Sequence, residues 1–150
     1  MIFKALSISS LVVIVDRLTK YILLKNLSEG ESVRVIPGIF HITLVFNSGA
    51  AFGIFKGRSV FFIILTALVI VLICLYIWRG GCRDLPVLIA LSLIAGGAAG
   101  NLIDRAAFGY VVDFLDFRVW PVFNIADSAI TIGAFILAIR LIFDKRCCTT

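Results

Sequence analysis

The sequence predicts an integral membrane protein built as a bundle of four transmembrane helices. Hydrophobic residues make up 61% of the 150 residues and charged residues 15%, and the mean hydropathy is +1.12. Soluble domains contain about half apolar and about a quarter charged residues. Four apolar runs approach the roughly 20 residues that a helix needs to cross a bilayer. These runs are residues 5–24, 59–78, 86–104 and 122–143. We therefore expect residues 1–150 to form a single membrane-embedded domain.

The net charge of +5 does not indicate nucleic-acid binding. The Lys and Arg residues stand mainly at the ends of the apolar runs, with no basic run and no interleaved aromatic residues. This distribution is typical of anchoring at lipid headgroups. We expect contact with membrane lipid and none with nucleic acid. The positive charges are similar in number on the two sides of the bundle, so they do not fix its orientation.

The first apolar run carries charged residues. Asp16 and Lys20 stand one helical turn apart with the acid first, which is the favourable order for an ion pair. Each charge costs roughly 2.5–3.5 kcal/mol near the bilayer centre, and pairing lowers that cost. We expect a structural ion pair in a permanent helix, because no small-residue cleavage site for a signal peptide follows it.

The long connection at residues 25–58 contains an expected β-strand. Residues alternate with period two from Ile39 to Phe46, which is typical of a strand. One face would carry Phe40, Ile42, Leu44 and Phe46. The strand region, about residues 33–46, would form a small amphipathic sheet on the membrane surface. The single histidine, His41, would be a satisfied surface residue, because no serine or cysteine stands near it in a nucleophile motif. The glycines of the following segment, residues 47–53, permit close approach to a ligand.

The third and fourth apolar runs indicate close helix packing around a polar interior. Gly96 and Gly100 stand four residues apart and let another helix approach. Asn101, Asp104 and Arg105 share one helical face, which would turn toward the bundle interior. A polar stripe on the fourth run would face protein or a water-filled cavity. Its members are Asn124, Asp127, Ser128 and Thr131.

Residues 101–128 hold four of the seven aspartates, which points to carboxylate chemistry. Two aspartic carboxyls that share one proton can hydrolyse a peptide bond, one acting as base on water and the other as acid toward the carbonyl. Asp127 is one natural member of such a pair, and either Asp113 or Asp116 is the other. A Ser-Lys dyad stays open, although its lysine would be Lys20, which has Asp16 as a partner. Zinc and redox motifs are absent, because Cys74, Cys82, Cys147 and Cys148 lack the required spacing.

Two other functions are compatible with these carboxylates. Asp113, Asp116 and Asp127 would hold magnesium in a metal-dependent phosphotransferase, although such sites usually use more carboxylates and a glycine-rich phosphate cradle. Alternatively, intramembrane acids would relay protons in a small carrier or an assembly subunit. Four spans are few for a carrier, and the sequence has no visible internal repeat.

Five blocks of polar and small residues follow one another along most of the chain. They are Asp16-Arg-Leu-Thr-Lys20, Asn47-Ser-Gly-Ala-Ala-Phe-Gly53, Gly97-Ala-Ala-Gly-Asn-Leu-Ile-Asp-Arg105, Val111-Val-Asp-Phe114 and Phe123-Asn-Ile-Ala-Asp-Ser128. Together they resemble the bacterial lipoprotein signal peptidase family, also called signal peptidase II. The resemblance implies a membrane aspartyl endopeptidase that removes signal peptides from prolipoproteins and cuts just before a cysteine that carries diacylglycerol.

The resemblance also implies roles for individual residues. The catalytic aspartates of the family fall on Asp113 and Asp127, which leaves Asp116 as a structural or solvated neighbour. Asp16 and Lys20 match a stabilising polar pair. The positions that support the catalytic pair or bind substrate match Asn47, Gly49, Asn101, Arg105 and Asn124.

The family likeness further implies architecture and location. We expect an all-α integral membrane fold, a four-helix bundle with a small extracytoplasmic β-sheet between the first and second helices. The protein would reside in the bacterial cytoplasmic (inner) membrane with both termini in the cytoplasm and its active site near the extracytoplasmic face. Its expected partners are lipidated prolipoprotein signal peptides and membrane lipid. We expect a monomer without cofactor or metal.

Overall fold

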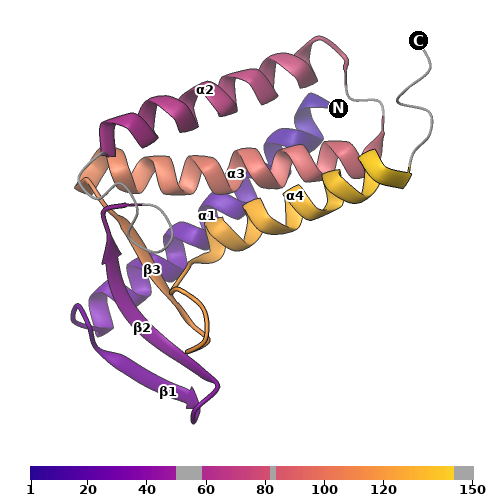
Figure 1. Ribbon diagram of the computed structural model, residues 1–150. Helices are drawn as coiled ribbons and strands as arrows, with labels where there is room; N and C mark the ends of the chain where they lie inside the picture. Colours follow the sequence, from indigo (N-terminus) through magenta and orange to yellow (C-terminus); the bar gives the residue numbers. More distant parts are fainter. Residues whose placement is uncertain (50–58, 82–83, 144–150) are drawn as a thin grey trace.

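A computed structural model describes residues 1–49, 59–81 and 84–143. Over these residues the chain forms four α-helices and a three-stranded sheet at one end of the bundle (Figure 1). The helices are α1 (Ile2–Asn26), α2 (Ser59–Trp78), α3 (Leu85–Phe108) and α4 (Ile125–Phe143). Each begins and ends within a few residues of the apolar run that predicted it, so the four-helix prediction is confirmed. Outside the described residues lie 50–53 of the second sequence block and the cysteines Cys82, Cys147 and Cys148.

Three of the helices, α2, α3 and α4, are long and apolar enough to cross a membrane, with mean hydropathies of 3.2, 1.8 and 1.9. Helix α1 is longer, at 25 residues, but Asp16, Arg17 and Lys20 interrupt its apolar surface. The protein is therefore a helical membrane protein. A membrane crossing by α1 stays a prediction.

Helix α3 lies between the other helices and packs closely on them through its small residues (Figure 1). A Cβ atom on Gly96 would lie 2.8 Å from the carbonyl oxygen of Ser9 in α1. A Cβ on Gly97 would collide with the carbonyl oxygen of Ala126 in α4. Backbone therefore meets backbone at both contacts, as small residues permit in membrane bundles.

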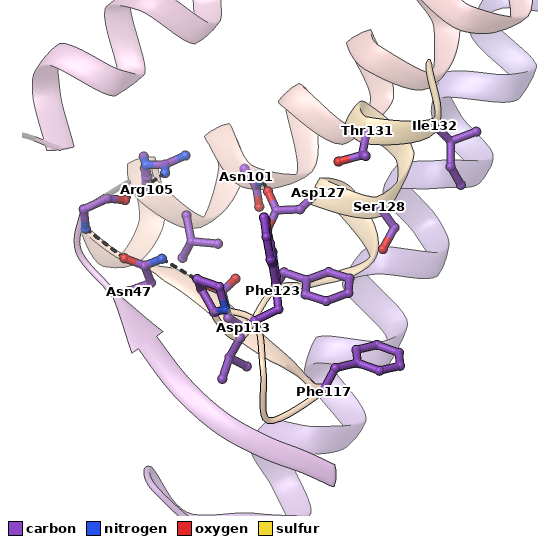
Figure 2. A pocket seen from close by; sticks show the side chains of 15 residues that line it. Asn47, Asn101, Arg105, Asp113, Phe117, Phe123, Asp127, Ser128, Thr131 and Ile132 are labelled. Atoms are coloured by element: carbon purple, nitrogen blue, oxygen red, sulfur yellow. Dashed lines mark hydrogen bonds between the residues drawn. The ribbon is translucent and has the colours of Figure 1, made fainter. Parts of the chain in front are cut away.

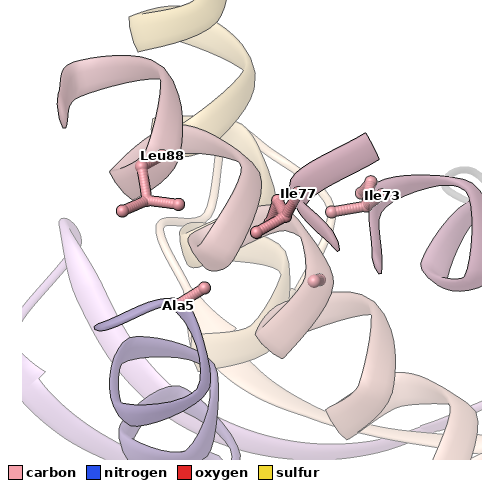
Figure 3. Packing of buried hydrophobic residues seen from close by; sticks show 5 residues of the cluster. Ala5, Ile73, Ile77 and Leu88 are labelled. Carbon is pink, nitrogen blue, oxygen red and sulfur yellow. The ribbon is translucent and has the colours of Figure 1, made fainter. Parts of the chain in front are cut away.

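An apolar cluster fills the bundle at the end away from the sheet (Figure 3). It is formed by Ala5 of α1, Ile73 and Ile77 of α2, and Leu88 and Ala95 of α3. Most of the buried polar side chains among the described residues lie nearer the sheet, among them Asp104, Asp113 and Asn124.

The sheet has the order β1-β2-β3 and is antiparallel throughout. Strands β1 (Ser32–Ile36) and β2 (Phe40–Asn47) lie in the region that was predicted to form a small sheet between the first two helices. Strand β3 (Val111–Asp116), between α3 and α4, was not predicted. It begins two residues after Gly109, whose φ of 80° ends α3 in the left-handed conformation that glycine adopts readily.

The predicted faces of β2 are wrong, because the strand contains a β-bulge. Ile42 pairs with Leu115 and Val45 with Asp113, so β2 has one residue more than β3 between these pairs. The extra residue interrupts the alternation, and the predicted common face of four apolar residues does not form. His41, expected at the surface, is only 8% exposed. It is buried because β3 adds a third strand beside β2, and its Nδ1 lies 3.3 Å from the hydroxyl of Ser32.

Candidate active site

A cavity of about 690 Å³ opens between the sheet, α3 and the start of α4 (Figure 2). Hydrophobic side chains such as Phe117, Trp120 and Ile132 make up much of its wall. Six residues that the family likeness singles out also line it, namely Asn47, Gly49, Asn101, Arg105, Asp113 and Asp127. Two carboxyls from different elements therefore open into one cavity.

Strand pairing brings Asp113 to the cavity. Asn47 at the end of β2 pairs with Val111, and Asp113 lies two residues further along β3, on the same face of that strand. The Nδ2 group of Asn47 donates to Oδ2 of Asp113 at 3.0 Å (Figure 2). The backbone N–H of Gly49 donates to Oδ1 of Asn47, also at 3.0 Å. The turn after β2 therefore fixes the amide that holds Asp113.

The first turn of α4 positions Asp127. Asn124 caps this helix: its Oδ1 accepts the N–H of Asp127 at 2.9 Å, and Oδ2 of Asp127 accepts the N–H of Asn124 at 3.4 Å. These reciprocal bonds have the pattern of a capping box. The second carboxyl oxygen, Oδ1, accepts a hydrogen bond from Nδ2 of Asn101 at 2.7 Å. A carboxylate at this end of a helix is also favoured by the helix dipole.

Asn124 connects the two carboxyls beneath the cavity. Its side chain is fully buried, and its Nδ2 lies 2.6 Å from Oδ1 of Asp113 and 3.1 Å from Oδ1 of Asn101. Asn101 in turn donates to Asp127. A chain of amides therefore runs from Asp113 through Asn124 and Asn101 to Asp127.

Burial changes the acidity of Asp113, which is 2% exposed. Loss of hydration, followed by the negative charge of Asp127, raises the pKa of Asp113 to about 7. Hydrogen bonds from Asn47 and Asn124 and the positive charge of Lys20 act in the opposite direction. Asp113 is therefore poised to bind or release a proton near neutral pH.

Arg105 supplies positive charge at the edge of the cavity. Its guanidinium attracts both Asp127 and Asp113 electrostatically. It also lies 5.1 Å from the centre of the Phe62 ring and donates a long hydrogen bond, 3.4 Å, to the carbonyl oxygen of Gly49. These contacts place a cation between α2, α3 and the turn after β2.

Asp116, the other candidate on β3, lies outside the cavity lining. Its carboxyl accepts hydrogen bonds from the Thr43 hydroxyl at 2.8 Å, the Arg118 N–H at 2.8 Å and the Arg118 guanidinium at 3.1 Å. Burial alone would raise the pKa of Asp116, but these bonds and the charge of Arg118 lower it below its usual range. The structure brings Asp113, and not Asp116, to the cavity that Asp127 lines.

A second group of buried charges lies behind the cavity, between α1 and α3. Nζ of Lys20 is 2.8 Å from Oδ2 of Asp16, the expected partner, and 2.6 Å from Oδ2 of Asp104. Arg17 pairs with Asp104 and lies 3.4 Å from Asp16. We call these four residues the four-charge cluster. The sequence placed Asp104 toward the interior but did not reveal its partners, because they lie on another helix.

Comparison with known proteins identifies the family. The sequence matches the Signal peptidase (SPase) II family over residues 8–143. The lipoprotein signal peptidase of Halothermothrix orenii is 46% identical over 131 residues, which cover 87% of this chain and 90% of that protein. The lipoprotein signal peptidase of Moorella thermoacetica is 48% identical over 138 residues, 91% of each chain.

Solved structures agree with this relationship. A bacterial membrane enzyme solved at 2.3 Å by the in meso method is 38% identical, with a TM-score of 0.92 over 99% of this chain and 93% of its own. A second bacterial membrane enzyme, solved at 1.9 Å, is 39% identical, with a TM-score of 0.88 over 97% and 96% of the two chains. The chain described here belongs to the signal peptidase II family.

Proposed function

We propose that this chain is a membrane aspartyl endopeptidase that removes the signal peptide from diacylglyceryl-modified prolipoproteins. It would cut just before the lipidated cysteine, using a water molecule activated between Asp113 and Asp127. The observation that carries this mechanism is that both carboxyls line one cavity and are joined through the amides of Asn124 and Asn101.

One proton shared by the two carboxyls is sufficient for the reaction. The ionised carboxyl takes a proton from water as the water oxygen attacks the scissile carbonyl carbon, and the protonated carboxyl gives its proton to the carbonyl oxygen. The tetrahedral diol then collapses: the C–N bond breaks, the departing nitrogen receives one carboxyl proton, and a diol hydroxyl returns a proton to the other carboxyl. The raised pKa of Asp113, about 7, supports a pair that keeps one proton near neutral pH.

Amide and guanidinium groups around the pair would orient it and hold the substrate. Asn124 and Asn101 contact the carboxyls directly, and we assign them to orientation of the pair. Asn47 and Arg105 stand at the edge of the cavity beside Gly49. We assign these three residues to binding of the substrate backbone near the scissile bond.

The apolar wall suits a substrate that lies in the membrane. A signal peptide is an apolar helix, so it would approach from the side and place its polar scissile bond against the carboxyls. Phe117, Trp120 and Ile132 line the same cavity as Asp127 and offer hydrophobic contact to such a helix. The proposed mechanism uses no cofactor, and a single chain supplies both carboxyls.

The course of the chain supports the proposed orientation. The start of α1 and the end of α4 lie at one end of the bundle, and the sheet and cavity lie at the other (Figure 1). Four crossings, α1 included, would leave both termini on one side of the membrane and the active site near the other. We assign the termini to the cytoplasm and the active site to the extracytoplasmic face of the bacterial inner membrane, as the family likeness implies.

Cleavage of a lipidated prolipoprotein by three purified variants tests the proposal. Asp113→Asn and Asp127→Asn each remove an ionisable oxygen but keep its shape, and we expect cleavage to fall by at least about 100-fold with the protein still folded. Asp116→Asn, on the same strand but outside the cavity, is the matched control and retains most of the activity. Full activity in either of the first two variants refutes the mechanism. Activity that survives a strong chelator is also expected, and its loss would favour a metal-dependent enzyme.

A further inference from the structure

The four-charge cluster holds the backbone next to both proposed catalytic residues. Oδ1 of Asp16 accepts the N–H of Ala126 at 3.1 Å, and Oδ2 of Asp104 accepts the N–H of Val112 at 3.2 Å. Ala126 directly precedes Asp127, and Val112 directly precedes Asp113. Each buried carboxylate of the cluster is therefore bonded to the peptide unit one residue before a carboxylate of the cavity.

Both N–H groups need such an acceptor. Ala126 lies in the first turn of α4, where backbone donors have no partner within the helix. Val112 is fully buried, so water cannot take the place of Asp104. An unsatisfied donor at either position would be costly, and the chain supplies acceptors from α1 and α3 instead.

Lys20 couples the two acceptors. Its Nζ lies 2.8 Å from Asp16 and 2.6 Å from Asp104, and all three side chains are at most 2% exposed. Gly100 leaves the space for this arrangement, because a Cβ atom there would lie 2.9 Å from Oδ2 of Asp16. None of the three charged residues lines the cavity, so they reach the reaction only through the backbone and through their charge.

We propose that Asp16 and Asp104 are positioning residues that, bridged by Lys20, set the separation of the two catalytic carboxyls. The inference rests on the proposed function, in which Asp113 and Asp127 act on the substrate. Asp104 fixes the β3 side of the pair and Asp16 fixes the α4 side. Because one ammonium group holds both, the two catalytic carboxyls are placed relative to each other. Displacement of a reacting group by about 1 Å lowers turnover by about 100-fold.

Matched double variants isolate the backbone acceptor from the charge. Asp16→Asn with Lys20→Gln keeps an oxygen for the N–H of Ala126, whereas Asp16→Ala with Lys20→Gln removes it, and both pairs have the same net charge. Asp104→Asn and Asp104→Ala, each combined with Arg17→Gln, repeat the test for Val112. The measurements are kcat and KM for a lipidated prolipoprotein at a temperature where each variant is folded, and amide hydrogen exchange at residues 126 and 112.

The alanine member of each pair is expected to have a kcat at least about tenfold lower than its asparagine partner, with KM changed by less than about twofold. Exchange of the amide that has lost its acceptor should accelerate in the alanine member alone. Equal kcat within both pairs overturns the inference, and so does a loss of kcat that equals the fraction of unfolded protein.

A single substitution provides the same test if an alanine variant does not fold. Gly100→Ala pushes on Asp16 and, at 3.3 Å, on Cβ of Ala126 without changing any charge. We expect it to lower kcat and leave KM nearly unchanged. An unchanged kcat in folded Gly100→Ala overturns the inference. Failure of the proposed function gives a different result, because Asp113→Asn or Asp127→Asn would then remain active whatever the matched pairs show.

Discussion

Two buried acidic pairs lie close together in this protein and differ in the groups that contact their carboxyls. In the four-charge cluster, Asp16 and Asp104 meet the cations of Lys20 and Arg17, so two negative charges face two positive ones. In the cavity, Asp113 and Asp127 accept hydrogen bonds from the neutral amides of asparagine residues, and the cation of Arg105 attracts them without a salt bridge among the described contacts.

This difference in partners explains how carboxylates at similar depth can serve different purposes. Removal of one partner from a buried ion pair is strongly destabilising, so such a pair holds its neighbours in place. A carboxyl held by amides, beside another acid, can keep or lose a proton near neutral pH. The cluster is thus suited to holding structure, and the cavity to moving protons.

The largest effect is expected when the cluster loses its central cation. Lys20→Met leaves two buried carboxylates without their shared partner and should lower the free energy of unfolding by about 3–5 kcal/mol. Denaturant unfolding in detergent measures it. The control is Arg140→Met, which breaks a partly exposed ion pair with Asp84 and should cost no more than about 1 kcal/mol. Equal losses in the two variants would show that the cluster is not a structural fixture.

A smaller effect is expected where α3 and α4 touch between the two acidic pairs. Gly97→Ala places a methyl group against the carbonyl of Ala126 and should destabilise the protein by about 1–3 kcal/mol through overpacking. It should also lower cleavage, because the first turn of α4 must move. Ile103→Ala on the exposed face of α3 serves as the control and should leave cleavage unchanged. An active and fully stable Gly97→Ala would contradict the observed helix contact.

Asn124→Ala tests the amide link within the cavity. It removes the helix cap, which should cost about 1–2 kcal/mol of stability, and it removes the donor to Asp113. Cleavage at a temperature where the variant is folded should fall more than for Ser128→Ala, whose hydroxyl bonds only to the Asn124 carbonyl among the described contacts. Similar kcat values for the two variants would argue against Asn124 as an orienting residue.

The pH dependence should be the mildest distinction between the two acidic pairs. Because the folded-state pKa of Asp113 is raised to about 7, its proton favours the folded state, and this contribution is lost as pH rises from about 4 toward 7 and above. Cleavage should decline as pH rises above 7, when the shared proton leaves. The measurement is the free energy of unfolding of the wild-type protein minus that of Asp113→Asn, and this difference should be smaller at pH 8 than at pH 5. A pH-independent stability difference between them would contradict the raised pKa.

Local sequence patterns predicted what depends on neighbouring residues in the chain. Long apolar runs indicated the four helices, and the period-two pattern indicated β2, because both signals arise within a single segment. The spacing of Asp16 and Lys20 likewise anticipated a contact that one helix makes with itself. The polar stripe on the fourth run indicated the cavity face, where Asp127, Ser128 and Thr131 lie.

Contacts between distant segments could not be predicted from these local patterns. Strand β3 pairs with the edge of β2, which lies more than 60 residues earlier in the chain. No pattern within Val111–Asp116 predicts a strand there. The bulge in β2, the burial of His41 beside β3 and the pairing of Asp104 with Lys20 likewise depend on contacts between distant segments. The choice between Asp113 and Asp116 also depended on strand register, so composition left it open and only the family likeness assigned it.

The double duty of Asp127 affects how its chemistry can be probed. The same carboxyl oxygen that accepts the N–H of Asn124 also belongs to the proposed acid–base pair. Asp127→Ala would therefore remove a hydrogen bond at the beginning of α4 as well as the carboxyl that acts on the substrate. A loss of cleavage in an alanine scan would not separate the two causes. Amide replacement retains one acceptor oxygen for the N–H of Asn124 and gives up only the oxygen that accepts from Asn101, so it disturbs the helix less than truncation does.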